Sequence, residues 1–348
     1  MLRRGSKSAW RGSRLNMVQP RWENQDFLNR SSTCRNAQTD MHVFCSEVYR
    51  LSAGVRLLDT ALPMMALANP GHVRVMRAVP ARFMTLLSCM LLAVLYAQPA
   101  LGQHTQQIMI RSNPGVCTVD QWKQDWPGCR YEDGVSERHL SVVKAEDDKA
   151  YRVDYVVGEI GPEKGGVGWR YPITRSHSVE LKYRLTFSRD FDWVKGGKLP
   201  GLYGGPESVT GGKPADGKNG FSARLMWRAD GRGEAYVYHM NQPKKYGESF
   251  PFPAEYRFPT AEPVLVRMRV TMNTPGRRDG QLDVWIGNGE SGEYRRVVRR
   301  SDLEWRATTD LAVDGLLFET FYGGGDKTWA PRRPSFALFR EISIRSLK

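Results

Sequence analysis

Hydrophobic and polar residues alternate along the second half of the chain with the period of a β-strand. In residues 178–188 every second residue is apolar, and residues 263–272 repeat the pattern. Shorter apolar runs follow at Leu282–Ile286, Leu316–Phe321 and Phe336–Ile344. Turns rich in glycine and proline separate these runs, and no long stretch has the helical period. The pattern predicts an all-β fold of two sheets, and we expect a β-jelly roll sandwich with a concave substrate-binding sheet.

The first hundred residues predict export. Residues 1–75 show no sustained period, which indicates a disordered or mis-assigned leader. Residues 76–102 contain a basic start, an apolar run over Phe83–Ala97 and the small-residue ending Ala100-Leu101-Gly102. These are the parts of a signal peptide, although a start at Met1 would permit a signal anchor. The run is short for a spanning helix. We therefore expect a secreted or periplasmic protein, a single domain over residues 103–348, without stable membrane insertion after signal cleavage.

Charge narrows the choice of partner. The net charge is +14, but residues 1–102 hold 13 Lys/Arg and only 5 Asp/Glu. An excess of six positive charges remains in the expected mature domain. This excess suits a groove for an acidic polymer, and solubility alone would also explain it. No block of Lys and Arg resembles a nucleic-acid-binding tail, so we expect no nucleic-acid partner. We also expect the protein to be a monomer.

Only Cys117 and Cys129 lie in the expected mature domain. Two cysteines in an exported chain usually pair, so the sequence predicts a disulfide that closes a loop holding Trp122 and Trp126. Two free thiols are the alternative. No histidine pair lies near them at zinc-ligand spacing, and we expect neither a metal nor a cofactor.

Five residues of the central segment form the candidate catalytic set. Lys198 lies in a glycine-rich stretch, and Ser222 and Arg224 follow on an expected strand. Tyr236 and Tyr238 lie on the next expected strand. Residues two apart on a strand point to the same face, so each pair shares one side.

The register of the hairpin decides whether the two pairs meet. A two-residue turn at Asp230-Gly231 would place Arg224 opposite Val237, and both tyrosines would point away. A loop centred on Gly231 places Arg224 opposite Tyr238 instead, and glycine permits the left-handed conformation that such a loop needs. We predict the second register.

These residue types suit β-elimination on a uronate polymer. The reaction removes the proton on C5, beside a carboxylate, and protonates the leaving oxygen on C4. Positive charge must offset the charge that develops on the carboxylate, which Arg224 and Lys198 can supply. A tyrosine close to cations can transfer the proton.

The same residues carry a family resemblance. The segment from Gly196 to Gly205, the strand Phe221–Arg228 and the Tyr-x-Tyr strand resemble polysaccharide lyases of family 14, the alginate lyase group. They are also similar to the family 20 glucuronan lyases. The resemblance implies a β-jelly roll lyase of a 1,4-linked uronate polymer. It implies that the lysine, serine, arginine and both tyrosines line the cleft, with one tyrosine in proton transfer. A non-catalytic carbohydrate-binding sandwich is the alternative function.

Six further residues are candidates for substrate binding, and each has a structural alternative. Trp227 could form a sugar platform if exposed, but packing is the commoner role. Lys244, Lys245 and Tyr246 follow the hairpin and could bind flanking sugars, or form a solvated loop. Arg267 and Arg269 could line the concave sheet, or form an ordinary polar face.

Overall fold

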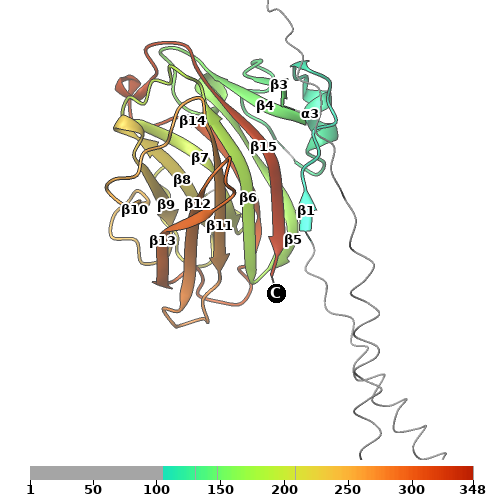
Figure 1. Cartoon of the computed structure of the whole chain (residues 1–348). Coiled ribbons are helices and arrows are strands. Elements are labelled where there is room, and N and C mark those ends of the chain that lie inside the picture. Colours follow the sequence, from blue (N-terminus) through green and yellow to red (C-terminus); the bar gives the residue numbers. More distant parts are fainter. Residues whose placement is uncertain (1–104, 130, 147, 208, 348) are drawn as a thin grey trace, which may run out of the picture. The chain divides into compact units, whose positions relative to one another are not determined.

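The computed structural model describes residues 105–129, 131–146, 148–207 and 209–347, which form two antiparallel β-sheets (Figure 1). The predicted leader and signal peptide, residues 1–102, lie outside the described residues. Within the described ranges, no helix is long and apolar enough to cross a membrane.

The larger sheet has nine strands. Its order is β13 (Tyr294–Leu303), β12 (Gly280–Asn288), β11 (Pro263–Thr271), β6 (Ser178–Phe187), β15 (Ser335–Ser346), β4 (Asp148–Tyr155), β3 (Leu140–Ala145) and β2 (Gly115–Val116), with β1 (Thr105–Gln107) also pairing with β15. The alternating segments near residues 180 and 268 became β6 and β11, two adjacent strands of this sheet. This confirms the period-two prediction.

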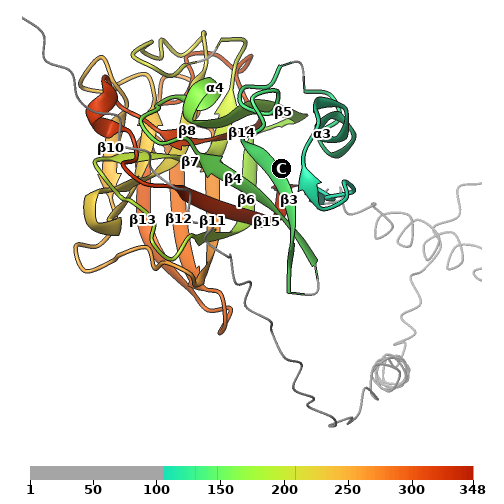
Figure 2. The same ribbon diagram turned by 90° about the horizontal axis from the view of Figure 1, so that it is seen from above.

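The smaller sheet has six strands. Its order is β10 (Glu248–Pro251), β9 (Gly233–Tyr238), β8 (Phe221–Arg228), β7 (Gly196–Gly204), β14 (Val313–Tyr322) and β5 (Gly166–Ser176). Figure 2 shows the two sheets as separate layers, with β7, β8 and β14 in one and β11, β12 and β13 in the other. The described helices are short: α3 (Val119–Asp125), α4 (Pro162–Gly165), and the 3-10 turns η1 (Ala229–Gly231) and η2 (Lys327–Trp329). The architecture is the predicted β-jelly roll.

Aromatic side chains fill the space between the sheets. Trp169 of β5 stacks on Phe318 of β14, with ring centroids 4.5 Å apart. Trp227 of β8 is fully buried and packs edge-on against Tyr322 at 5.1 Å. The expected sugar platform at Trp227 is therefore wrong, because odd-numbered residues of β8 point into the core.

The predicted disulfide is also wrong, since Cys117 and Cys129 are free thiols. A short helix that the sequence did not predict, α3, occupies the segment between them. Its first turn is fixed by a capping box, in which Thr118 and Gln121 exchange side-chain and backbone hydrogen bonds. Trp122 and Trp126 pack in the core, so burial rather than a cross-link fixes this segment. Burial also raises the pKa of the Cys117 thiol to about 11.

The hairpin between β8 and β9 partly follows the prediction. Arg224 lies opposite Tyr236, and Ser222 lies opposite Tyr238, so all four residues share one face as expected. The pairing is shifted by two residues, however, because the loop is centred on Asp230 and not on Gly231. Asp230 has a φ of 61°, a left-handed conformation that aspartate tolerates in turns.

Candidate active site

A pocket of about 680 Å³ lies on the outer face of the six-stranded sheet. Strands β7, β8, β9 and β14 form its floor, and loops around residues 210, 246 and 324 form its walls. The lining residues are Pro162, Lys198, Thr210, Gly211, Arg224, Met226, Arg228, Tyr236, Tyr238, Tyr246, Glu319, Phe321, Gly323, Gly324, Gly325 and Trp329. Four of the five predicted catalytic residues are therefore brought together.

Arg224 lies at the base of this pocket and is 2% exposed. Its Nη1 atom forms an ion pair with Glu319 of β14, which comes from a distant part of the sequence. Its Nε atom is buried and has no hydrogen-bond partner among the described residues. The guanidinium lines the pocket and places positive charge at its base.

Lys198 of β7 lies beside Arg224 on the same face. Its Nζ atom donates to the Sδ atom of Met226 at 3.2 Å and lies 4.6 Å from the ring centroid of Tyr236. Burial, together with the positive charges of Arg224 and Arg228, holds the pKa of Lys198 well below its usual value. A lysine in this state can lose its proton and act as a base.

The two tyrosines have different environments. Tyr238 is 1% exposed, and its hydroxyl accepts a hydrogen bond from the backbone N–H of Gly212 at 2.9 Å. Tyr236 is more exposed and packs edge-on against Tyr238, with ring centroids 5.8 Å apart. Burial and the neighbouring Tyr238 raise the pKa of Tyr236 above its usual value. Tyr236 therefore remains protonated at neutral pH and can donate a proton into the pocket.

Ser222 differs from the other four predicted catalytic residues. Its side chain is 1% exposed, and its Oγ atom donates to the backbone carbonyl of Val209 at 2.7 Å. Val209 in turn packs against Tyr238. Ser222 thus fastens the loop that leads to Thr210 and Gly211 at the pocket wall, and it is not itself a lining residue.

The family model of polysaccharide lyase 14 matches residues 143–342, which include every strand of the pocket floor. The chain belongs to the polysaccharide lyase 14 family. It is a polysaccharide lyase, and the resemblance found in the sequence is confirmed. A search of curated proteins gave no match.

Solved structures share the fold of this lyase. The marine PL-14 alginate lyase from Aplysia kurodai is 25% identical, with a TM-score of 0.61 over 70% of this chain and 99% of its own. Alginate lyase Aly36B is 24% identical, with a TM-score of 0.61 over 70% and 97%. Alginate lyase vAL-1 from Chlorella virus is 18% identical, with a TM-score of 0.54 over 68% and 99%.

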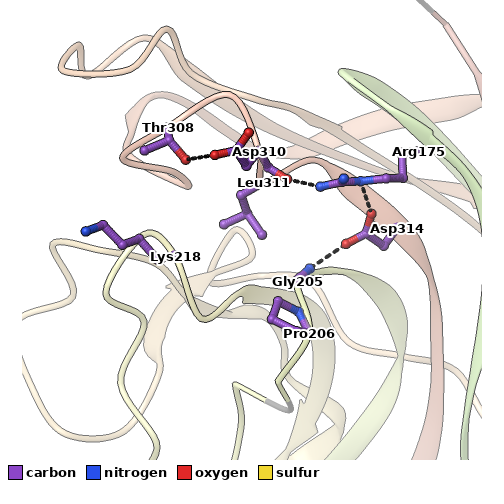
Figure 3. A pocket seen from close by; sticks show the side chains of 8 residues that line it. All are labelled: Arg175, Gly205, Pro206, Lys218, Thr308, Asp310, Leu311 and Asp314. Atoms are coloured by element: carbon purple, nitrogen blue, oxygen red, sulfur yellow. Dashed lines mark hydrogen bonds and ion pairs between the residues drawn. The ribbon is translucent and has the colours of Figure 1, made fainter.

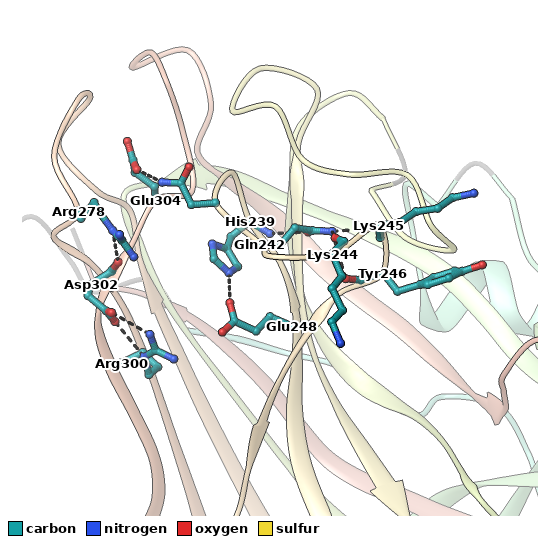
Figure 4. Close-up of polar contacts among 11 residues, drawn as sticks. His239, Gln242, Lys244, Lys245, Tyr246, Glu248, Arg278, Arg300, Asp302 and Glu304 are labelled. Carbon is teal, nitrogen blue, oxygen red and sulfur yellow. Dashed lines mark hydrogen bonds and ion pairs between the residues drawn. The ribbon is translucent and has the colours of Figure 1, made fainter.

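The loop between β9 and β10 contains three of the residues that were predicted to bind substrate, and one of them lines the pocket of the lyase. Tyr246 lines the pocket, whereas Lys244 and Lys245 do not. The side-chain amide of Gln242 donates to the backbone carbonyls of all three residues and holds the loop in shape (Figure 4). The binding of flanking sugars by the two lysines stays a prediction.

Arg267 and Arg269 lie on the other sheet, so their expected place on the substrate-binding sheet is wrong. Both belong to β11 of the nine-stranded sheet, and each donates to the carboxylate of Glu180 at 2.8 Å. Their guanidinium carbons lie 4.4 and 5.5 Å from the ring centroid of Trp285. Alternation placed them correctly on a polar face, but it does not reveal which sheet a strand joins.

Several lining residues were not among the predicted catalytic or binding residues. Glu319 is a charged residue within the apolar strand β14. Its spacing of two residues from Leu317 and from Phe321 places all three on one face of the strand, which was the available signal. Met226 lies two residues after Arg224 on β8, so shared strand parity was the available signal. Arg228 and Trp329 approach each other across the pocket, with the guanidinium carbon 5.7 Å from the ring centroid. Only the folded chain brings η2 to the end of β8.

A second carboxylate lies next to Glu319. The backbone of Asp133 bridges to Gly168 of β5, which pairs with Glu319. Burial and the negative charge of Glu319 raise the pKa of Asp133 to about 6. Among the described residues, no group of three or more His, Cys, Asp or Glu side chains could hold a metal ion.

Proposed function

We propose that this lyase is exported and cleaves a 1,4-linked uronate polymer, alginate or glucuronan, by metal-independent β-elimination. The observation that carries the proposal is the Arg224 guanidinium, which Glu319 holds at the base of a pocket that Lys198 and Tyr236 also line. A uronate carboxylate bound in this pocket pairs with the guanidinium. The alginate lyases with the same fold support this substrate class, and a variant of Aly36B was solved in complex with alginate trisaccharide.

Binding of the carboxylate to Arg224 prepares the sugar for elimination. The guanidinium neutralises the charge that moves onto the carboxylate when the C5 proton leaves. The electron pair of the C5–H bond forms the C4–C5 double bond, and the C4–O bond breaks. The leaving oxygen takes a proton, and one product carries an unsaturated uronate at its new end.

The base that we propose differs from the sequence expectation, whereas a tyrosine keeps a role in proton transfer. We assign the base to Lys198, because its lowered pKa makes the neutral amine accessible. After it takes the C5 proton, the new ammonium adds positive charge beside the enolate. We assign the acid to Tyr236, whose raised pKa keeps it protonated. Tyr238 positions Tyr236 and the Gly212 loop.

The products distinguish elimination from hydrolysis. We expect the purified mature chain to cleave at least one of polymannuronate, polyguluronate and glucuronan. Elimination adds no water, so the product masses sum to the mass of the substrate, whereas hydrolysis adds one water at each cut. Mass spectrometry after chelator treatment therefore tests both the reaction and its metal independence. Products with added water, intact polymers or activity lost on chelation contradict the proposal.

Export has a separate test. The basic, apolar and small-residue segments of residues 76–102 support a cleaved signal peptide. We expect the exported protein to begin near Gln103 when its first residues are sequenced. Retention of the full chain inside the cell contradicts this part of the proposal.

A further inference from the structure

A second basic pocket adjoins the active site. It has a volume of about 580 Å³ and lies at the closed end of the β8–β9 hairpin. Lys195, Arg228, Arg232 and Arg257 line it, together with a single acidic residue, Glu234. Arg228 lines both pockets, so the two form neighbouring parts of one surface.

The charges of this pocket are poorly balanced. Glu234 forms an ion pair with Arg228 at 2.6 Å. Within the described ranges, Lys195, Arg232 and Arg257 form no ion pair; Arg232 and Arg257 donate to nearby backbone carbonyls. Like charges that remain unpaired around a hollow attract anions.

A pocket elsewhere among the described residues lacks this excess. The pocket of about 780 Å³ at the far end of the sheet holds Arg175 and Lys218 against Asp310 and Asp314, and Arg175 is bound to Asp314 at 2.9 Å (Figure 3). Of these three pockets in the described part of the chain, the two that share Arg228 hold more basic than acidic residues.

Aromatic and backbone contacts connect and fix the two basic pockets. Trp329 lines the active site, and the Nζ atom of Lys195 lies 5.9 Å from its ring centroid. The wall of the second pocket is anchored where the N–H of Phe252 donates to the carbonyl of Gly233 at 2.9 Å. A chain leaving the active site past Trp329 and Arg228 therefore meets a preformed cationic surface.

We propose that the pocket around Lys195, Arg232 and Arg257 is a distal subsite, which binds carboxylates of the same polyuronate chain away from the cleaved bond. This inference rests on the proposed function. It makes the enzyme prefer long chains, because only a long chain reaches both pockets and each added contact lowers the free energy of binding.

The test compares chain lengths. The ratio of kcat/KM on the polymer to kcat/KM on the shortest cleaved oligomer is measured for the wild type and for the Arg232→Ala/Arg257→Ala double variant. We expect the ratio to fall about three- to tenfold, the range expected for two exposed charge contacts. The Arg232→Lys/Arg257→Lys variant should restore most of it. Arg299→Ala, an exposed arginine on the opposite sheet, is the matched control.

The outcomes separate the two proposals. If the wild type cleaves uronate polymers but the double variant keeps the same ratio, the subsite is refuted and the proposed function stands. An equal loss at every chain length also refutes the subsite, because it indicates a general structural effect. If no uronate polymer is cleaved, the proposed function fails and the subsite fails with it.

Discussion

At the scale of single residues, the lowered pKa of Lys198 can be tested through the pH dependence of the reaction. The neutral amine becomes populated as the pH rises through its lowered pKa, so we expect kcat/KM to rise with pH below the usual lysine range. Arg228 is one of the charges that lower this pKa. Arg228→Gln should therefore move the rising limb to higher pH, whereas Arg228→Lys should keep it. A limb that does not move in Arg228→Gln assigns the base to another group.

Asp133 supplies a second titration, which affects stability. Its pKa is about 6 in the folded protein and near 3.8 when unfolded, so the folded state holds the proton more tightly. Ionisation then destabilises the fold as the pH rises from about 4 to about 6. We expect Asp133→Asn to raise Tm at pH 7.5 and not at pH 4, measured by thermal unfolding. An equal change in Tm at both pH values contradicts the raised pKa.

Four of the five predicted catalytic residues do line one pocket. They could be predicted because the sequence shows both the residue type and the strand parity. Ser222 shares that parity, but its hydroxyl is used by the carbonyl of Val209, a contact that depends on how a loop folds back. Glu319 was missed for a related reason. Its partner Arg224 lies on a strand far away in the sequence, and single-strand patterns do not identify such pairs.

At the scale of elements, two tryptophans near the pocket have opposite roles. Trp227 is buried between the sheets, and Trp329 of η2 lines the active site. We expect Trp227→Ala to lower the free energy of unfolding by about 3–5 kcal/mol, because it leaves a large cavity. Trp329→Ala should leave stability nearly unchanged and raise KM. Urea denaturation and steady-state kinetics of both variants check this; a stable Trp227→Ala with a raised KM would reverse the two roles.

Period-two alternation was sufficient for the long strands, because one face of each is buried and the other is polar. It was insufficient where local backbone geometry sets the pairing register of a hairpin or forms a short helix. The β8–β9 loop adopts a left-handed Asp230, which shifts the pairing by two residues while preserving parity. Helix α3 is too short to show a helical period, and its capping box at Thr118 was the available signal.

At the scale of the whole molecule, the two sheets handle positive charge differently. On the nine-stranded sheet, Arg267, Arg269 and Arg345 surround the single buried carboxylate of Glu180. On the six-stranded sheet, the arginines and lysines outnumber the acids in two adjoining pockets. The sequence shows the total charge but not this division, because the division depends on which strands pair.

The most direct test of the account is the initial rate at which unsaturated uronate forms from the preferred polymer, followed by its ultraviolet absorbance. We expect Lys198→Ala to lose about 10²–10⁴-fold in this rate, the usual contribution of a general base, while keeping the wild-type Tm. The control Arg299→Ala should stay within about twofold, as expected for a surface change far from the site. A folded Lys198→Ala enzyme that forms unsaturated product at the wild-type rate would contradict the account.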